Sequence, residues 1–265
     1  MKSKKIILES GELLLSDIVL GTCSFGSTIS ESDSFALLDR YYELGGRTID
    51  TARVYAAFIE NGESASERTI GKWLDSRGVR NDITLVTKGA HPPIGNMNRS
   101  RLDRESIVGD ITRSLELLKT DSVDLFLLHR DDSNVPVEEI VDTLDLLVKK
   151  GMTKAVGVSN WKAERIAEAN AYSERAGKTK ISVSQIQWSL ARTTPEALND
   201  PTIVCMNSEE YSGSLKNNIP VMAFSSQCKG LFSKYILEGE NALNDKIRQR
   251  FLNDFNLNRV EKVRE

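Results

Sequence analysis

Four residues suited to moving protons stand at the ends of apolar stretches of the chain. The stretch Arg47–Tyr55, RTIDTARVY, ends a short β-branched run at Asp50 and places Tyr55 just beyond a turn of small residues. Further along, ITLVTK stops at Lys88 and VDLFLLH stops at His129. A carboxylate, a phenol, an amine and an imidazole are groups that serve general acid–base chemistry. In a parallel barrel they would lie at the carboxyl ends of the strands, which is the functional face.

Each of these residues also has an ordinary structural interpretation. An aspartate after a strand commonly caps a helix or forms a turn. A lone lysine at a strand end is usually solvated, a lone histidine there is usually satisfied in the core or at its rim, and a loop tyrosine is usually packed. The combination of the four residue types at three strand ends is what favours a catalytic interpretation.

The sequence predicts strands that alternate with helices. An opening hairpin is expected over Lys5–Leu15, with its turn at Ser10-Gly11. Seven short apolar strands are predicted near residues 18, 48, 84, 125, 156, 184 and 221. Apolar spacing and capping residues predict the intervening helices, over Ser30–Glu43, Ser64–Ser76, Asp103–Lys119, Pro136–Lys150, Trp161–Ala176 and Ser208–Asn217. An irregular segment is expected over Arg192–Asn207 and a largely helical tail from Leu243.

Strands alternating with helices of this length imply βαβ units and a parallel sheet. Seven such units after a hairpin predict an α/β fold, a (β/α)8 TIM barrel, as a single domain over residues 1–265. A doubly wound sheet is the alternative, but no G-x-G-x-x-G motif follows the first strand. No eighth strand or C-terminal barrel helix is predicted before the charged ending RVEKVRE. We therefore expect a truncated chain, because an open parallel edge exposes unpaired backbone groups.

Composition argues against several classes of function. The 265 residues are 40% hydrophobic and 28% charged, as is ordinary for a globular protein, and the net charge of −3 gives no case for nucleic acid. No run approaches the ~20 apolar residues of a membrane span. Glu9 and Glu12 make the first apolar run a poor signal peptide. The three cysteines, Cys23, Cys205 and Cys228, are too few and too far apart for a disulfide framework or a metal site. We therefore expect a cytoplasmic protein that binds no metal.

Six segments, in chain order, resemble the aldo-keto reductase superfamily: GTCSFG, RTIDTARVY, TLVTK, VDLFLLH, GVSN and VMAFSSQCKGLF. The resemblance covers nearly the whole chain. It implies a TIM barrel that uses NAD(P)H to reduce an aldehyde or ketone to an alcohol. The family's catalytic Asp, Tyr, Lys and His correspond to Asp50, Tyr55, Lys88 and His129, and none is substituted.

The resemblance implies a role for each of the four residues. A hydride that reaches a carbonyl carbon leaves negative charge on the oxygen, which needs a proton and fixed donors. Tyr55 would supply the proton, and the Lys88 ammonium would lower the tyrosine pKa from its usual ~10. Asp50 would hold Lys88 and keep it charged. His129 would hydrogen-bond the carbonyl oxygen and orient the substrate.

The resemblance also implies a nicotinamide nucleotide site. Residues expected to bind the carboxamide, stack on the ring or wrap the pyrophosphate are Ser159, Asn160, Gln185, Phe224, Ser225, Ser226, Gln227 and Gly230. The structural alternatives are a helix cap at Ser159-Asn160 and a buried strand amide at Gln185. Phe224 replaces the usual Tyr, and Ser-Ser-Gln replaces the common Ser-Pro-Leu. Relatives bind the adenosine with a segment that follows the eighth strand, and this sequence does not contain that segment. NADP(H) is therefore expected over NAD(H) only because the family commonly uses it.

Less is indicated for the substrate. Phe25, Phe58 and Trp188 could line an apolar mouth for a small-molecule carbonyl substrate, although each could instead pack in the core or on the surface. His91 follows Lys88 closely and is assigned no role. We expect no nucleic acid or membrane partner, and the sequence carries no signal for an oligomeric state.

Two rival functions stay open. A cofactor-binding regulatory subunit would keep the barrel and the nucleotide with little turnover, as the β subunits of potassium channels do among relatives. An unrelated barrel enzyme could use Lys88 as a Schiff-base amine. The neighbouring Asp50 and Tyr55 make that second alternative less favoured.

Overall fold

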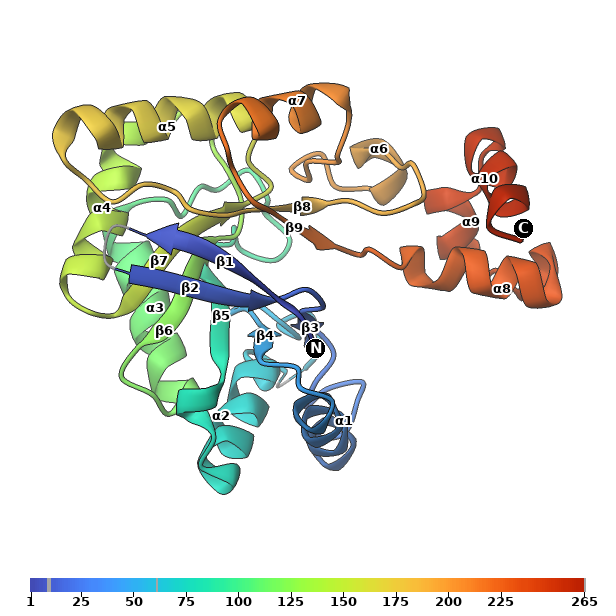
Figure 1. Cartoon of the computed structure of the whole chain (residues 1–265), viewed down its shortest axis with the longest axis horizontal. Helices are drawn as coiled ribbons and strands as arrows, with labels where there is room; N and C mark the ends of the chain where they lie inside the picture. Colours follow the sequence, from blue (N-terminus) through green and yellow to red (C-terminus); the bar gives the residue numbers. More distant parts are fainter. Residues whose placement is uncertain (9–10, 61, 265) are drawn as a thin grey trace. The chain divides into compact units, whose positions relative to one another are not determined.

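The structure is a computed structural model that describes residues 1–8, 11–60 and 62–264 (Figure 1). The chain divides into two compact units. The first unit contains Met1–Ser159 and Glu164–Val183, and the second contains Asn160–Ala163 and the chain from Ser184 onward. The single-domain assignment stays a prediction.

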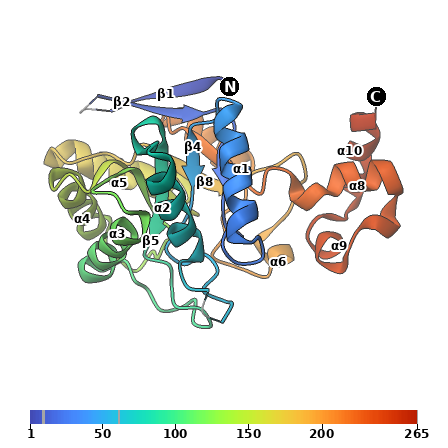
Figure 2. The same ribbon diagram turned by 90° about the horizontal axis from the view of Figure 1, so that it is seen from below.

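The first unit opens with the predicted hairpin. Strands β1 (Ser3–Leu8) and β2 (Gly11–Ser16) pair antiparallel, and the predicted turn residue Ser10 lies outside the described residues. Two hydrogen bonds attach the hairpin to the parallel strands: the Ser16 backbone N–H donates to Thr48 Oγ1 at 2.8 Å, and Thr84 Oγ1 donates to the Leu14 carbonyl at 2.7 Å. Thr48 and Thr84 begin two of the parallel strands, so the hairpin covers the amino ends of the strands (Figure 2).

Five parallel strands follow in the first unit, each paired with the next in chain order. They are β3 (Leu20–Gly21), β4 (Thr48–Asp50), β5 (Thr84–Gly89), β6 (Val123–Leu128) and β7 (Thr153–Ser159). All six residues of β6 are buried, as expected for a parallel strand covered on both faces. The connecting helices are α1 (Glu31–Glu43), α2 (Ala65–Arg77), η1 (Arg80–Asp82), α3 (Arg104–Leu118), α4 (Val137–Lys149) and α5 (Ala163–Ala176).

Local signals in the sequence explain where these helices begin and end. Ser30 Oγ accepts the Asp33 N–H at 3.1 Å before α1, and Asp103 accepts the Ser106 N–H at 2.8 Å before α3. Gly78 ends α2 with a φ of +65°, a conformation that favours glycine. The buried face of α4 follows helical spacing, through Val137, Ile140, Val141, Leu144 and Leu147. Neighbouring helices contact one another in chain order from α1 to α4, as in the outer ring of a barrel.

The second unit contains the last two parallel strands. Strand β8 (Ser184–Gln187) pairs with β9 (Val221–Phe224). Its helices are α6 (Pro195–Leu198), α7 (Ser208–Lys216), η2 (Cys228–Gly230), α8 (Leu231–Glu238), η3 (Glu240–Ala242), α9 (Asp245–Phe251) and α10 (Asp254–Arg264). A small apolar core joins α8 and α9 through Leu231, Ile247 and Phe251. The short helix α8 was not predicted, and α6 lies within the segment predicted to be irregular.

The seven parallel strands, their helices and the opening hairpin confirm the predicted α/β fold of the (β/α)8 barrel type. After Phe224 the described residues form helices and turns without a further strand, which agrees with the predicted lack of an eighth strand. Across the part of the chain that the structure describes, no helix has both the length and the apolar character needed to cross a membrane.

Candidate active site

The candidate active site lies in the first unit at the carboxyl ends of β4, β5 and β6. Asp50 is the last residue of β4, Lys88 is the penultimate residue of β5, and His129 directly follows β6. These strands are adjacent and parallel, so their carboxyl ends share one edge. Tyr55 comes from the loop after β4. The structure therefore brings together all four residues that the sequence singled out.

Lys88 is the centre of the site. Its side chain is only 1% exposed, and Nζ lies 2.7 and 2.8 Å from the two Asp50 carboxylate oxygens, 2.8 Å from the Thr51 carbonyl and 3.0 Å from the Tyr55 hydroxyl. Burial, the largest influence, lowers the pKa of Lys88, but Asp50 and Tyr55 outweigh it and the net pKa is raised. Lys88 is thus favoured in its charged ammonium form although it is buried.

Tyr55 is the residue for which the sequence-based expectation needs correction. The Lys88 ammonium does act to lower the tyrosine pKa, as expected. Burial acts more strongly in the opposite direction, Asp50 adds to it, and the pKa of Tyr55 is raised above its ordinary value. A raised pKa keeps the phenol protonated at neutral pH, which is the state that a proton donor needs.

His129 completes the group. It is 8% exposed, and its ring meets the Tyr55 ring edge to face with the centroids 6.0 Å apart. Burial first, and then the positive charges of Arg130 and Lys88 and the neighbouring His91, hold the pKa of His129 well below its usual range. His129 is therefore a neutral imidazole at pH 7, which can donate one N–H without adding a charge.

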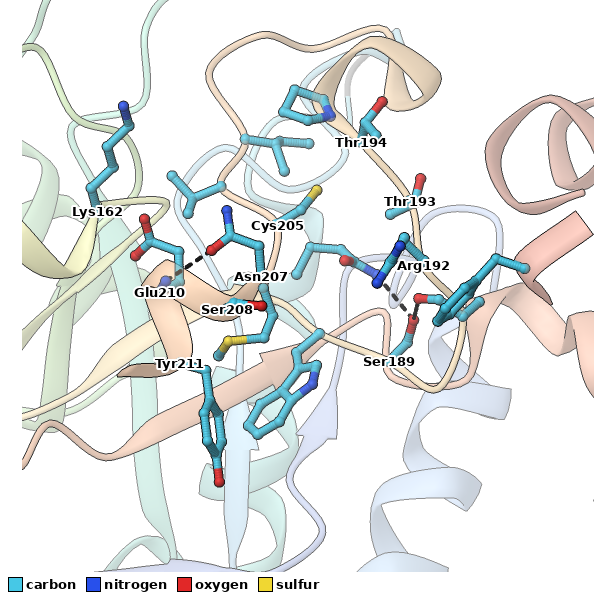
Figure 3. A pocket seen from close by; sticks show the side chains of 18 of the residues that line it. Lys162, Ser189, Arg192, Thr193, Thr194, Cys205, Asn207, Ser208, Glu210 and Tyr211 are labelled. Carbon is cyan, nitrogen blue, oxygen red and sulfur yellow. Dashed lines mark hydrogen bonds between the residues drawn. The ribbon is translucent and has the colours of Figure 1, made fainter. Parts of the chain in front are cut away.

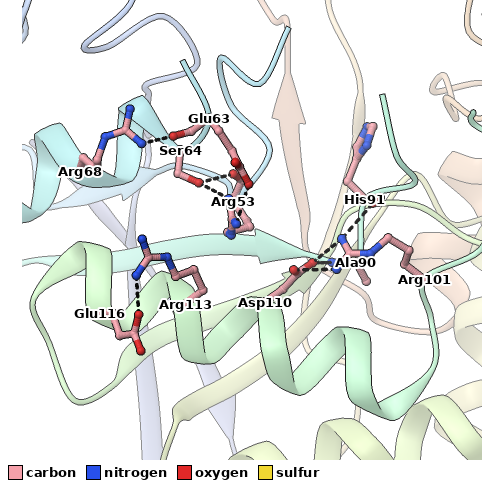
Figure 4. A network of polar contacts seen from close by, with 10 residues as sticks. All are labelled: Arg53, Glu63, Ser64, Arg68, Ala90, His91, Arg101, Asp110, Arg113 and Glu116. Atoms are coloured by element: carbon pink, nitrogen blue, oxygen red, sulfur yellow. Dashed lines mark hydrogen bonds and ion pairs between the residues drawn. The ribbon is translucent and has the colours of Figure 1, made fainter. Parts of the chain in front are cut away.

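The loop after β4 is held by bonds that the sequence did not reveal. Arg53 donates its backbone N–H to the Lys88 carbonyl at 2.9 Å, and its guanidinium binds Glu63 at 2.7 Å and contacts Ser64 (Figure 4). Ser64 Oγ donates in return to the Arg53 carbonyl at 2.6 Å. Tyr55 lies between these anchored residues, so its position is fixed by a loop tied at both ends.

The sequence also did not reveal that Thr51 supports Lys88. Its carbonyl receives a bond from Lys88, and its hydroxyl lies 2.8 Å from Ser66 Oγ, which in turn lies 2.8 Å from Thr22 Oγ1. A backbone carbonyl is present in every residue, so no sequence signal could have marked this one.

The group has the parts that reduction of a carbonyl needs. An oxygen that gains negative charge could be met by the Tyr55 O–H and the neutral His129 N–H. The ammonium of Lys88 would then stabilise the phenolate left on Tyr55. Asp50 keeps Lys88 charged and limits its movement. Preorganised donors of this kind need little rearrangement when the charge develops.

The candidate nucleotide residues divide between the units. Ser159 ends β7 in the first unit and is buried. In the second unit the Asn160 N–H bonds to the Gln185 carbonyl at 3.0 Å, and Asn160 Oδ1 accepts the Val204 N–H at 3.2 Å. Both amide side chains are 3% exposed. Buried primary amides that offer donors and acceptors fit the recognition of a carboxamide.

The loop after β9 fits a phosphate-bearing ligand by the chemistry of its donors. Phe224 is half-buried, and Ser225, Ser226 and Gln227 are exposed. Ser225 has a φ of +52°, and Gly230 has a φ of +82° and donates its N–H to the Gln227 carbonyl at 2.8 Å. The resulting tight turn exposes the hydroxyl side chains of Ser225 and Ser226 and the amide side chain of Gln227, and these groups can bond to phosphate oxygens. The residues present therefore fit a nicotinamide nucleotide.

The three predicted substrate residues lie in different surroundings. Phe25 is 3% exposed and packs in the core of the first unit, whereas Phe58 is 71% exposed. Trp188, in the second unit, is 38% exposed and meets Tyr211 edge to face at 6.1 Å. Their role as substrate contacts stays a prediction.

Trp188 and Tyr211 line a cavity of about 720 Å³ within the second unit (Figure 3). The Arg192 guanidinium stacks on the Phe255 ring on one wall, 3.9 Å from the ring centroid. Cys205 is another lining residue, and burial raises the pKa of its thiol to about 11. The thiol is therefore protonated at neutral pH and is a weak nucleophile. Within the described residues, no group of three or more metal-ligating side chains could hold a metal ion.

Comparison with known proteins establishes the family. The chain belongs to the aldo/keto reductase family, whose model matches residues 17–265. It is 34% identical over 189 residues to norsolorinic acid reductase stcV of Emericella nidulans, which covers 66% of this chain and 47% of that protein. It is 30% identical over 195 residues to an aryl-alcohol dehydrogenase [NADP(+)] of Phanerodontia chrysosporium, which covers 67% and 49%.

A third relative is the norsolorinic acid reductase of Aspergillus flavus, 34% identical over 200 residues, with 71% of this chain and 50% of that protein covered. The chain spans about half the length of the curated relatives it matches. The family membership agrees with the resemblance read from the six motifs.

Proposed function

We propose that this protein is an oxidoreductase that reduces an aldehyde or ketone to an alcohol with NADPH. The observation that carries the proposal is the position of the Lys88 ammonium, 2.7 Å from Asp50 and 3.0 Å from the Tyr55 hydroxyl. This arrangement does not exclude a cofactor-binding regulatory subunit of the same fold, from which saturable turnover of a carbonyl substrate would distinguish an enzyme. When bound, NADPH supplies the hydride.

The residues of the chain supply the proton and the electrostatic support. Tyr55 gives its hydroxyl proton to the carbonyl oxygen as the carbonyl carbon gains the hydride. The Lys88 ammonium stabilises the phenolate that remains, and Asp50 keeps Lys88 charged. His129 donates its N–H to the same oxygen and orients the carbonyl. The alcohol leaves, and Tyr55 regains a proton from solvent.

For the nucleotide, we assign Ser159, Asn160 and Gln185 to the carboxamide and Phe224 to the nicotinamide face. The loop that contains Ser225, Ser226, Gln227 and Gly230 is assigned to the pyrophosphate. The preference for NADP(H) over NAD(H) is supported by the Phanerodontia relative, whose name carries NADP(+).

The names of the relatives also suggest a substrate class. They are norsolorinic acid reductases and aryl-alcohol dehydrogenases, so we propose an aromatic aldehyde or ketone as the substrate. A cytoplasmic location, predicted from the cysteines, is part of the same proposal. The Schiff-base alternative is disfavoured, because an amine nucleophile needs a lowered pKa and that of Lys88 is raised.

The experiment is a titration followed by a turnover assay. Quenching of tryptophan fluorescence by NADPH and then by NADH measures binding, and a panel of aromatic and aliphatic aldehydes tests oxidation of the bound nucleotide. The proposal expects tighter binding of NADPH and saturable turnover of aromatic aldehydes. Binding without turnover of any carbonyl would favour the regulatory subunit, and failure to bind either nucleotide would contradict both functions.

A further inference from the structure

The loop after β5 carries an imidazole that the proposed mechanism does not use. The His91 ring packs against the His129 ring with the centroids 4.8 Å apart and the planes at 81°. Tyr55 meets the same His129 ring at 6.0 Å and 77°. The His129 imidazole therefore has two aromatic neighbours within the first unit, and both meet it at nearly a right angle.

The His91 ring is itself fixed. Its Nδ1 lies 2.6 Å from the Pro92 carbonyl oxygen. Because a carbonyl only accepts hydrogen bonds, this nitrogen carries the proton and donates it. The bond restricts rotation of the His91 ring, and the residue is half-buried. A ring held in this way can act as a stop for a neighbouring ring.

A clamp on the backbone fixes the loop that carries His91 (Figure 4). The Asp110 carboxylate, on α3, accepts the Ala90 N–H at 2.7 Å and two bonds from the Arg101 guanidinium at 2.8 Å each. Arg101 also donates to the His91 carbonyl at 3.2 Å. One ion pair thus holds two successive residues of the loop.

The clamp works against the local conformational preference of the chain. Ala90 has a φ of +58°, which a residue other than glycine rarely adopts. Gly89, just before it, allows α3 to come close, because an added Cβ would lie 2.9 Å from Asp110 Cβ and 2.8 Å from Phe126 Cζ. A strained residue persists only where its surroundings over-determine it, and such places are concentrated at functional sites.

We propose that His91 is a positioning residue that holds the His129 ring in the orientation required to hydrogen-bond the substrate carbonyl; this role rests on the proposed reductase function. His91 acts through His129 and is not assigned a contact with substrate or nucleotide. A donor that rotates away from its productive geometry loses much of its effect on rate while binding is retained.

The test compares His91→Ala, which removes the ring, with His91→Phe, which keeps an aromatic edge without the polar nitrogens. We expect His91→Ala to lower kcat for an aromatic aldehyde about 10-fold while NADPH binding is unchanged. His91→Phe should recover kcat to within about 3-fold of the wild type. Arg101→Gln, which loosens the clamp without changing the ring, should lower kcat in the same direction by a smaller factor.

A second readout does not depend on turnover. The sequence contains two histidines, His91 and His129, so ¹⁵N-histidine NMR of the full chain gives two ring systems. The His129 ring signals should shift and broaden in His91→Ala and should return toward their wild-type positions in His91→Phe. Circular dichroism of each variant checks that the fold is intact.

Three results would overturn the role of His91. They are wild-type kcat in His91→Ala, equal losses of kcat in the Ala and Phe variants, and His129 ring signals that do not change in His91→Ala. A wild-type protein that turns over no carbonyl overturns the proposed function itself, and the role of His91 falls with it. Because the NMR signals are measured without substrate, the two kinds of failure can be told apart.

Discussion

The buried charged group around Lys88 in the first unit and the loop after β9 in the second unit differ in how their polar side chains are exposed. At Lys88 every contact is made within the protein: the ammonium touches Asp50, Thr51 and Tyr55 and is 1% exposed. In the loop, Ser225, Ser226 and Gln227 leave their side chains exposed. The first arrangement fixes charge within the protein, and the second leaves polar groups exposed, which we propose bind the nucleotide. The two regions should therefore respond differently to mutation.

The largest effect is expected at Lys88. Lys88→Met leaves the Asp50 carboxylate buried without its cation, which typically costs about 3–5 kcal/mol. Turnover should fall at least ~10³-fold, since the phenolate of Tyr55 loses its stabilising charge. Chemical denaturation and NADPH oxidation measure the two effects.

Two variants sharpen that result. The double variant Asp50→Asn/Lys88→Met removes both charges, so it should regain much of the stability but none of the activity. Lys154→Met is the matched control, because Lys154 also pairs with a buried aspartate, Asp124, at 2.7 Å, but is itself 62% exposed and shares that aspartate with Arg80. It should cost under about 1 kcal/mol. A similar loss in both lysine variants would contradict the distinction between buried and exposed pairs.

A moderate effect is expected in the loop. Gln227→Ala removes an exposed side chain assigned to the pyrophosphate, so the Kd for NADPH should rise about 3- to 10-fold, as for loss of one neutral hydrogen bond. Stability and kcat at saturating NADPH should stay unchanged. The control is Gln249→Ala, an exposed glutamine on α9, which should leave the Kd as it is. Equal Kd values in both variants would remove Gln227 from the nucleotide site.

A smaller effect concerns Glu67, a buried carboxyl on α2 that accepts the Thr87 hydroxyl at 2.6 Å. Burial raises the pKa of Glu67. Ionisation is therefore less favourable in the folded state than in the unfolded state, and the protein loses stability as pH rises above the unfolded pKa of ~4.3. Glu67→Gln does not ionise, so it should raise Tm by about 2–4 °C at pH 7 and have little effect near pH 4.

The exposed Glu138 provides the comparison for Glu67. Glu138→Gln should change Tm by less than about 1 °C at either pH, as is usual for a surface position. Thermal unfolding followed at pH 4 and pH 7 measures both variants. A Glu67→Gln variant that loses stability at pH 7 would show that the carboxylate is needed in its charged form.

The smallest expected effect is that of pH on kcat. The raised pKa of Tyr55 keeps the proposed donor protonated, and the lowered pKa of His129 keeps the imidazole neutral. The kcat for reduction should therefore be nearly flat between about pH 6.5 and pH 10, the reference values of the two groups. A pH–rate profile with a fall centred between these limits would contradict the assigned protonation states.

The sequence was sufficient for the parts of the site that follow from strand ends. Asp50, Lys88 and His129 terminate or follow apolar runs, and adjacent parallel strands necessarily bring such residues to one edge. The helix starts at Ser30 and Asp103 were equally readable, since each cap acts within three residues of itself. These features depend on local pattern and on a fold with few alternatives.

Other features depend on packing that the sequence does not display. The direction of the Tyr55 pKa was wrong in the sequence-based prediction because burial outweighs the Lys88 charge. The clamp of Asp110 on the His91 loop joins α3 to the end of β5, and no motif marks it. Helix α8 was missed because it is short and lies between Gly230 and Gly239, whose φ values are +82° and +77°.

The central claim is that Tyr55 donates the proton, and Tyr55→Phe tests it most directly. This change removes one oxygen and keeps the ring that faces His129. Single-turnover oxidation of bound NADPH by an aromatic aldehyde should slow about 10²- to 10⁴-fold, while the Kd for NADPH and the Tm stay close to wild type. An unchanged rate in Tyr55→Phe, in a protein that binds NADPH normally, would contradict the account.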